Sequence, residues 1–350
     1  MENKVTDYKS LIKAVKDKKV HIAAHWDADG VSSGAIIYHL IKDHTKSISY
    51  HSKGEVFLVE NSEIDKDADL VICTDIQTAR LDVPLLFIDH HPIESKSMLK
   101  NELLGEIHDP DSQSCSLLIY NTFLKNNLKK FDLQEIKYFL FLTLIGFFGD
   151  AGDIEDLPID IYVLAKETIP ELMKVNQGYR TYLEIQRYVS LFNVSKRVHW
   201  NGELAIKALI KNTDFETIIY QKDPIAKELF EYKKDLKKDY KTSVKFNDLG
   251  SFKYSIINHK KNIQGVICAR YLEDTPLLVL NTSRNKIIGS MRVPDHLEFN
   301  AGEFLENCST KIESAHGGGH EKAGGISFNE EDLEDFIDII RNKSYDLLEN

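Results

Sequence analysis

The chain has 350 residues, of which 42% are hydrophobic and 28% are charged, and its formal net charge is −11 at pH 7. The length suits two globular domains, and the acidic balance excludes a general basic surface of the kind that coats duplex DNA, although locally placed positive charge or metal ions would still allow a nucleic-acid substrate. The longest apolar run, residues 139–148, is too short to span a bilayer, and the N-terminus lacks the apolar core of a signal peptide, which predicts a cytoplasmic protein without membrane contact.

The first hundred residues contain four short apolar segments that predict strands, at residues 19–24, 55–59, 69–74 and 85–88. Residues 30–44, between the first two segments, have the apolar spacing of a helix. Strands that are continuous apolar runs and alternate with helices are typical of parallel sheets covered on both faces. We therefore predict an α/β fold whose N-terminal part is a mostly parallel sheet flanked by helices.

Residues 111–240 predict mainly helices, and residues 224–245, with charge nearly everywhere, predict a long exposed connecting helix. The pattern then returns to strands, at residues 252–258, 265–272, 276–282 and 286–293. A final amphipathic helix over residues 331–348 would bury Leu333, Phe336, Ile337, Ile340 and Leu347. The predicted division is a catalytic metal-binding domain over residues 1–220, the connecting helix over residues 221–247 and a smaller α/β domain over residues 248–350, with the boundary near Asn247.

Four cysteines are scattered along the chain without a CxxC spacing. Cys73 and Cys268 lie within apolar runs, where a free thiol behaves as a small hydrophobic side chain. The sequence therefore argues against a metal site built from thiolates.

Metal-type side chains follow three of the predicted strands, where ligands of open parallel sheets bind. They are His25, Asp27 and Asp29 after the first strand, Asp75 after VICT, and Asp89, His90 and His91 after LLFI. A fourth acidic site, Asp150 and Asp153 in GFFGDAGD, follows a predicted buried helix. Carboxylates gathered at one sheet edge repel each other unless cations neutralise them. Carboxylate and imidazole donors in this number suit two divalent ions, Mn²⁺ first, with Mg²⁺, Co²⁺ or Zn²⁺ as alternatives.

Four stretches, HWDADG, CTD, FIDHHP and GFFGD, resemble the ordered motifs of the DHH phosphoesterase superfamily, and the HxDxDG form is similar to its RecJ-type branch. Two C-terminal stretches, IIGSMR and GGGHEKAGG, resemble the signatures of the companion DHHA1 domain. The resemblance extends over residues 20–325. It implies a DHH domain, a connecting helix and a DHHA1 domain, with an active-site cleft between the two domains.

The resemblance also assigns each predicted ligand to one of two ions that Asp75 bridges. One ion would be held by His25, Asp27 and Asp75, and the other by Asp29, Asp75, His90 and Asp150. Asp150 is favoured over Asp153 at the fourth motif. Asp89 would orient a histidine through its ring N–H, and His91 would face the substrate phosphate.

The DHHA1 signatures imply a phosphate-binding role for the second domain. The backbone N–H groups of Gly318 and Gly319 can approach a phosphate, and His320 would project as a donor from the glycine-rich loop. Arg292 can contact phosphate oxygens in a bidentate manner.

The expected activity is that of a compact RecJ-like exonuclease or nanoRNase, which removes nucleotides from an end of single-stranded DNA or RNA or from short oligonucleotides. One alternative is hydrolysis of small nucleotides such as pAp or linear and cyclic dinucleotides. An alternative of another class is a scaffold in replication complexes, since RecJ relatives serve as such partners. The complete set of metal ligands argues against a purely structural role, although an active enzyme can also dock on replication or repair proteins.

Overall fold

The structure is a computed structural model that describes residues 4–54, 58–76, 78–91, 103–150, 153–178 and 181–349. Residues 345–349 are described by their backbone alone. The chain divides into two compact units, Met1–Lys233 and Lys234–Asn350. The division falls within helix α10 (Pro224–Asp239), which begins at the predicted proline and ends earlier than residue 245. No helix within the described ranges is long and apolar enough to cross a membrane.

The first unit is built on a five-stranded parallel sheet in the order β2-β1-β4-β6-β7. Its strands are β1 (Lys19–Ala24), β2 (Ser47–Ser52), β4 (Leu70–Thr74), β6 (Leu85–Asp89) and β7 (Leu103–His108). The central strands β4 and β6 are buried along their whole length, as continuous apolar runs predict. The register pairs Ala24 with Thr74 and Thr74 with Ile88, so β1, β4 and β6 end at the same level of the sheet.

Sequence patterns predicted the three central strands but missed the two edges. Strand β2 is half-exposed and polar, and β7 carries Gly105 and Glu106, so neither has the apolar pattern of a buried strand. The predicted strand 55–59 is β3 (Leu58–Glu60) in its described part, and residues 55–57 lie outside the described residues. It pairs with β5 (Thr78–Arg80) in a separate small sheet rather than with β1.

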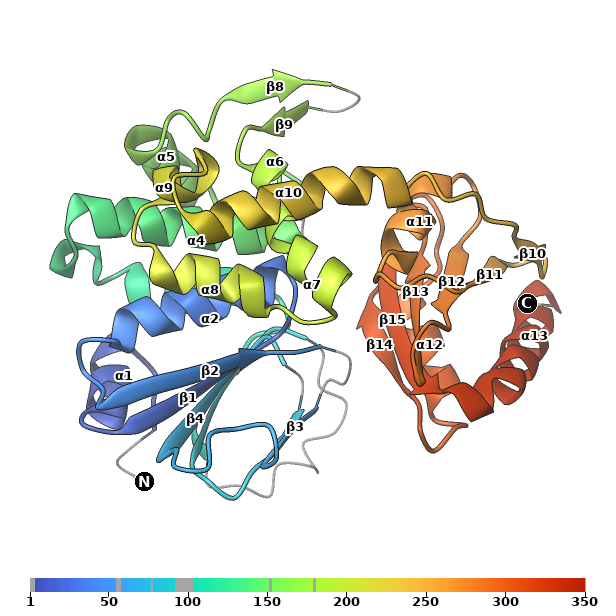
Figure 1. Cartoon of the computed structure of the whole chain (residues 1–350), viewed down its shortest axis with the longest axis horizontal. Coiled ribbons are helices and arrows are strands. Elements are labelled where there is room, and N and C mark those ends of the chain that lie inside the picture. The colour runs from blue at the N-terminus through green and yellow to red at the C-terminus, as the bar shows by residue number, and fades with distance from the viewer. Residues whose placement is uncertain are drawn as a thin grey trace. The chain divides into compact units, whose positions relative to one another are not determined.

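The two faces of the parallel sheet are covered differently. Helix α2 (Ala28–Ile41) packs on one face, with α4 (Leu133–Asp150) and α8 (Glu203–Lys211) beside it (Figure 1). The other face packs against the small β3–β5 sheet through an apolar cluster that includes Val59, Ala79 and Phe87. The predicted parallel sheet flanked by helices is therefore confirmed, and on this second face the small β3–β5 sheet adds to the cover.

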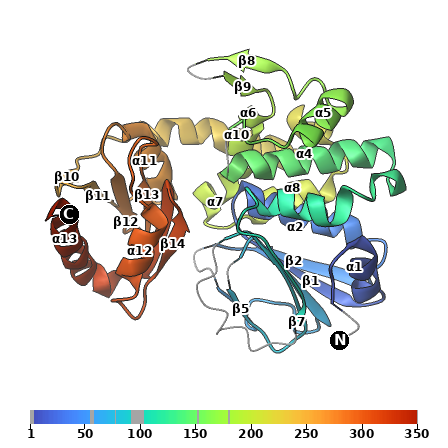
Figure 2. The same cartoon turned by 180° about the vertical axis from the view of Figure 1, so that it is seen from behind.

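The region after β7 is mainly helical, as predicted, apart from one short hairpin. Helix α4 is apolar all round because α2, α5, α6 and α9 contact it (Figure 2). The remaining elements of this unit are α1 (Tyr8–Val15), α3 (Cys115–Ile119), η2 (Tyr120–Leu124), η3 (Leu128–Lys130), α5 (Ile159–Thr168), β8 (Val175–Gln177), β9 (Thr181–Leu183), α6 (Gln186–Phe192), α7 (Val194–His199) and α9 (Phe215–Ile219).

Buried histidines make the stability of this unit depend on pH. His39 of α2 is 8% exposed and its Nε2–H donates to the Leu209 carbonyl at 3.0 Å, while burial lowers its pKa to about 4. Because the folded state resists protonation, the contribution of His39 to stability is present above about pH 6.5 and is lost as pH falls toward about 4. We expect the unfolding free energy of the wild type to fall between about pH 7 and about pH 5, and about 2 kcal/mol of this fall to be due to His39. His39→Gln keeps a donor but cannot titrate, so its unfolding free energy should fall by about 2 kcal/mol less over the same range.

Urea unfolding of the metal-free protein at both pH values measures this difference. An identical pH dependence in the variant and in the wild type would contradict the prediction.

The second unit has a mixed six-stranded sheet in the order β10-β11-β12-β13-β15-β14. Its elements are β10 (Asn247–Asp248), β11 (Lys253–Ile257), α11 (Gln264–Tyr271), β12 (Leu277–Asn281), β13 (Lys286–Arg292), α12 (Ala301–Ser309), β14 (His316–His320), β15 (Ala323–Asn329), η4 (Glu330–Asp332) and α13 (Leu333–Glu349). Helices α12 and α13 pack on one face through a cluster that includes Phe304, Phe328 and Phe336. This unit confirms a smaller α/β domain at the C-terminal end.

One predicted strand of this unit is a helix. Residues 265–272 form a largely apolar stretch that includes the β-branched Val266 and Ile267, yet they form most of α11. The reason is topological, because β11 and β12 are parallel neighbours and a parallel pair needs a crossover connection. In α11 the buried residues Gln264, Ile267 and Cys268 have helical spacing.

The final helix agrees with its prediction where it is described. Phe336, Ile337 and Ile340 are buried and Leu333 packs against the same cluster, while the side chain of Leu347 lies outside the described residues. Acidic residues occupy η4 and the first turn of α13, where negative charge stabilises a helix N-terminus.

Candidate metal centre

The acidic and histidine residues of the first unit meet where three parallel strands end. His25 follows β1 and donates its backbone N–H to Thr74 at 3.2 Å, and Asp75 follows β4 and donates to Ile88 at 3.0 Å. These two bonds continue the sheet by one residue. Asp89 is the last residue of β6 and is followed by His90 and His91, so all three strand ends present their side chains at one edge.

A first group is formed by His25, Asp27 and Asp75, whose ligand atoms lie within 4.8 Å of one another. His25 Nδ1 lies 3.0 Å from Asp27 Oδ2 and 3.3 Å from Asp75 Oδ2. Asp27 is also the N-cap of α2, because its Oδ1 accepts the backbone N–H of Gly30 at 3.1 Å. One carboxylate oxygen thus holds the helix while the other faces the group.

A second group joins Asp29, Asp75, His90 and Asp150, again within 4.8 Å. His90 Nε2 lies 3.1 Å from Asp150 Oδ2, 3.4 Å from Asp75 Oδ1 and 3.9 Å from Asp29 Oδ2. On the other side of the ring, Nδ1–H donates to the carbonyl of Ser112 at 3.0 Å. That bond orients the ring so that Nε2 faces the carboxylates.

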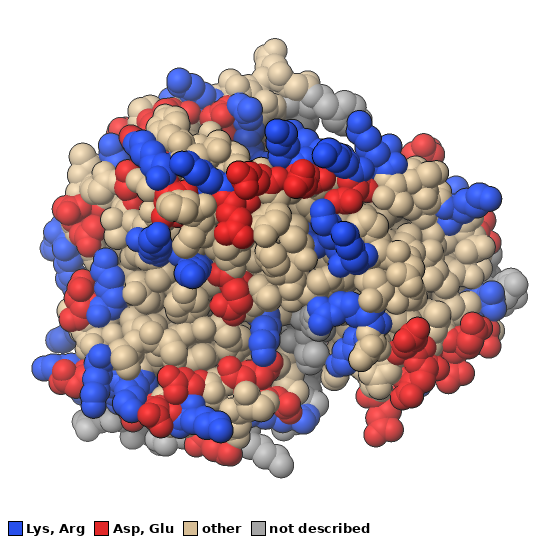
Figure 3. Space-filling model, viewed as in Figure 1, with Lys and Arg blue, Asp and Glu red and all other residues tan. Residues whose placement is uncertain are grey.

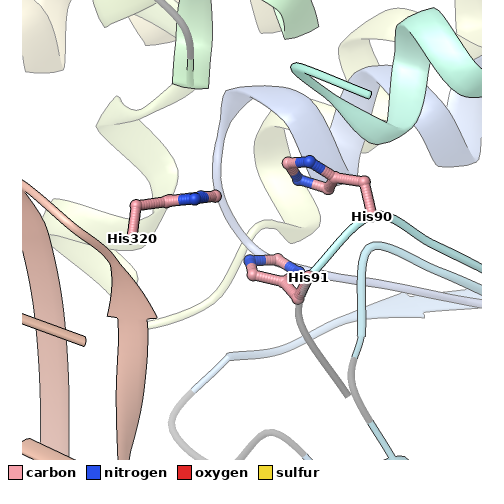
Figure 4. Close-up of side chains that lie close together, drawn as sticks. All are labelled: His90, His91 and His320. Atoms are coloured by element: carbon pink, nitrogen blue, oxygen red, sulfur yellow. The ribbon is translucent and has the colours of Figure 1, made fainter. Parts of the chain in front are cut away.

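A third group contains Asp75, Asp89 and His91. His91 Nδ1 lies 2.9 Å from Asp89 Oδ1, and Figure 4 shows the rings of His90 and His91 side by side, with their centroids 4.7 Å apart. The carbonyl of His91 accepts the Nε2–H of His108 at 2.7 Å. Asp75 belongs to all three of these groups, whereas Asp153 is exposed and belongs to none of those found among the described residues.

Asp75 has a left-handed backbone, with φ of +61°. Aspartate tolerates this conformation better than most residues other than glycine, but it still carries a conformational cost. The turn directs the side chain from the end of β4 toward both His25 and His90, on opposite sides of the carboxylate. A strained backbone at the shared residue is the kind of feature that functional sites retain.

Asp29 is held by a helix that the sequence motifs did not indicate. Its Oδ2 accepts the backbone N–H of Cys115 at 2.6 Å and its Oδ1 accepts that of Ser116 at 3.0 Å, both in the first turn of α3. Gly146 of α4 passes so close that an added Cβ would overlap Asp29 Oδ1 and the Ser116 hydroxyl. A glycine in an otherwise apolar helix was the one available signal for this close approach.

The charges within the cluster balance each other. Burial by itself would lower the pKa of His25 and His90, but the carboxylates of Asp27 and Asp75 together outweigh burial and raise the pKa of His25 to about 10, while Asp150 and Asp75 together raise that of His90 to about 12. Burial, together with the charges of Asp75 and Asp150, raises the pKa of Asp29 well above its usual range. Without metal, the imidazolium rings thus offset part of the negative charge.

The donor set fits divalent metal ions. It combines carboxylate oxygens and imidazole nitrogens, and none of the four buried cysteines belongs to the groups found among the described residues. Within the described ranges, the buried oxygens Asp75 Oδ1 and Asp89 Oδ2 accept no hydrogen bond. Buried carboxylate oxygens without a hydrogen bond are costly, and a cation would satisfy them.

The predicted phosphate-binding residues of the second unit lie on β13 and β14, the two strands that flank β15. The glycine-rich stretch is not a free loop, because its residues form β14 and the start of β15 in an antiparallel pair. The register places Arg292 of β13 and His320 of β14 on either side of Ala323, so these side chains share one face of the sheet. Gly319 has φ of +132°, which a residue with a Cβ rarely adopts, and His320 extends from the end of β14 (Figure 4).

A parallel α/β sheet whose strand ends share one aspartate among groups of carboxylates and histidines defines a metal-dependent hydrolase. Residues 19–146 match the model of the DHH family, N-terminal domain, and residues 253–344 match that of the DHHA1 domain. The chain belongs to the DHH/DHHA1 phosphoesterase superfamily. Comparison with curated protein sequences gives no match.

Solved structures resemble the chain in fold at low sequence identity. RecJ from Thermus thermophilus in complex with Mn²⁺ has a TM-score of 0.63 and 16% identity over 97% of this chain and 54% of its own. Exonuclease RecJ bound to manganese has a TM-score of 0.56 and 15% identity, covering 97% and 93% of the two chains. CDC45 from Entamoeba histolytica has a TM-score of 0.52 and 9% identity, covering 97% and 98%. The chain thus spans about half the length of the Thermus RecJ.

Proposed function

We propose that the protein is a two-metal phosphodiesterase that hydrolyses the terminal phosphodiester bonds of single-stranded nucleic acid or of short oligonucleotides. The observation that carries the proposal is the carboxylate of Asp75, which has one oxygen toward His25 and the other toward His90. In this role Asp75 bridges two ions, one held with His25 and Asp27 and the other with Asp29, His90 and Asp150. RecJ structures of the same fold contain Mn²⁺, which supports manganese as the ion.

When bound, two divalent ions lower the pKa of water and neutralise charge on phosphate oxygens. The residues of this chain then act around them. Asp89 fixes the ring of His91 by accepting its Nδ1–H, and its carboxylate opposes the effect of burial and raises the pKa of the ring, so that the imidazolium form can also donate its Nε2–H to a phosphate oxygen of the substrate. Ser112 fixes the ring of His90 in the same way through its carbonyl, which leaves Nε2 to bind metal.

Residues 248–350 provide substrate recognition in this proposal, and residues 221–247 connect them to the catalytic domain of residues 1–220. Arg292 and His320 bind a phosphate, with the backbone N–H groups of Gly318 and Gly319 close enough to help. A single strand can be bound without a wide basic surface. The face of the molecule in Figure 3 fits this requirement, because basic and acidic side chains are intermixed on it.

A replication scaffold is a second candidate, because the fold also resembles that of Entamoeba CDC45. Fold similarity does not establish function, and the complete groups of metal-binding side chains favour the enzyme. Hydrolysis of pAp or of linear or cyclic dinucleotides uses the same chemistry on a smaller substrate.

The test is a time course with Mn²⁺ on end-labelled RNA and DNA single strands of two to about thirty nucleotides, with the label at either end. Progressive shortening of long strands would indicate a RecJ-like exonuclease and its polarity. Cleavage of the shortest substrates alone would indicate a nanoRNase-like enzyme. If no strand is cut, the proposal fails, and assays with small nucleotides and with replication proteins decide between the two other candidates.

His320→Ala is expected to weaken substrate binding, because it removes a donor at the end of β14, whereas all the proposed metal ligands belong to the first unit. The loss of kcat/KM should be about ten- to a hundredfold, the effect of one charge-assisted hydrogen bond, while Mn²⁺ affinity stays unchanged. Steady-state kinetics and Mn²⁺ titration measure the two quantities. An unchanged kcat/KM would count against a phosphate contact at His320.

A further inference from the structure

Lys196, which lies outside the recognised motifs, reaches the metal cluster from a distant part of the chain. It belongs to α7, and its Nζ lies 3.5 Å from Asp27 Oδ2, across 169 residues of sequence. That oxygen is the same one that faces His25 Nδ1 at 3.0 Å. Both side chains of the ion pair are largely buried, with 22% of Lys196 and 19% of Asp27 exposed.

Two residues that precede Lys196 are tied to the surrounding structure through their side chains. Asn193 accepts the backbone N–H of Ala28, in the first turn of α2, at 3.2 Å. The buried hydroxyl of Ser195 accepts the backbone N–H of Leu204 at 3.2 Å. Since its neighbours are fixed, Lys196 is presented to the first group of metal-binding side chains from a defined direction.

An ammonium group at this position opposes metal binding. Without metal it partly neutralises Asp27, and a divalent ion that takes the same carboxylate oxygen must compete with it and then repel it at close range. A lysine with no partner other than the metal site would therefore weaken metal binding. An ammonium beside a metal ion becomes favourable when an anion lies between them, as in sites where lysines and metal ions bind phosphate together.

We propose that Lys196 is a substrate-binding residue of the phosphoesterase, which leaves Asp27 when metal binds and then contacts a non-bridging oxygen of the phosphate. This inference rests on the proposed function and deepens it by adding a protein cation to the first unit's own phosphate site. Phosphate binding then requires Lys196, whereas metal binding does not.

The test separates metal binding from phosphate binding in Lys196→Gln. Calorimetric titration of the metal-free protein with Mn²⁺ should show affinity equal to wild type or up to roughly tenfold higher, because a competing cation is gone. The Mn²⁺-loaded variant should bind adenosine 5′-monophosphate, a product of the proposed reaction, about ten- to a hundredfold more weakly, and Lys196→Arg should restore part of this loss.

Lys211→Gln is a matched control. Lys211 pairs at 2.8 Å with Asp223, which accepts backbone N–H groups at the start of α10 as Asp27 does at the start of α2. This variant should bind Mn²⁺ and the nucleotide as wild type does. Lys211→Gln therefore shows the effect of removing a lysine from an ion pair with a helix-capping aspartate where no metal-binding group is involved.

Three results would overturn the role of Lys196: unchanged nucleotide affinity in Lys196→Gln, a parallel loss of Mn²⁺ affinity, or no nucleotide binding by the Mn²⁺-loaded wild type. Failure of the proposed function looks different. In that case wild type itself binds no Mn²⁺, or it binds Mn²⁺ and the nucleotide but cleaves no phosphodiester.

Discussion

Asp75→Asn is expected to reduce phosphoesterase turnover by at least about 10³-fold, because it removes negative charge from the one carboxylate shared by the three groups of metal-binding side chains in the first unit. Asparagine tolerates the left-handed backbone at this position, so the fold should be kept. Asp75→Ala should be equally inactive, and it should also lose about 1 kcal/mol of stability because alanine is disfavoured at this φ.

The measurements are turnover in saturating Mn²⁺ and thermal unfolding with and without Mn²⁺. Wild type should be stabilised by the ion, whereas both variants should show little or no shift. Asp153→Asn is the control, since Asp153 is exposed and should leave both quantities unchanged. Wild-type turnover by Asp75→Asn in Mn²⁺ would refute the bridging role.

Gly146→Ala is expected to destabilise the protein and to damage the site together. Replacing a glycine in the middle of a helix by alanine usually stabilises by about 1 kcal/mol, but here the new methyl would overlap Asp29 and Ser116. Overpacking of this kind should cost about 2 kcal/mol of unfolding free energy. Any movement of Asp29 also displaces a carboxylate of the second group, and a shift of about 1 Å can lower turnover about a hundredfold.

Urea unfolding and turnover in Mn²⁺ test this prediction. Gly265→Ala is the matched control, because Gly265 also lies in a helix but its added Cβ would meet the Ser290 hydroxyl at an ordinary contact distance of 3.4 Å. That variant should be as stable as wild type or slightly more stable. If Gly146→Ala were as stable and as active as wild type, α4 could not be packed against Asp29 as described.

The sequence by itself determined the central strands and the residues that follow them. Apolar runs such as LVICT and LLFID are suited only to buried strands, and parallel strands bring their carboxyl ends to one edge, so His25, Asp75, Asp89 and His90 had to meet there. Local pattern was enough because each side chain lies next to the strand that positions it.

Where local pattern and topology disagreed, topology decided. The apolar stretch 265–272, which was predicted as a strand, is helix α11 because the parallel pairing of β11 with β12 requires a crossover. The polar edge strands β2 and β7 pair on one side only, so they carry no continuous apolar run that a sequence pattern could detect.

Only the tertiary structure decided how the cluster is held. Asp29 depends on the first turn of α3 and on Gly146, and Asp27 faces Lys196 from 169 residues further along the chain. Such contacts leave no periodic signal, because they join elements through side chains whose spacing in the sequence is arbitrary. The motifs therefore identify the atoms of the site, whereas packing between distant helices sets their orientation and the charge beside them.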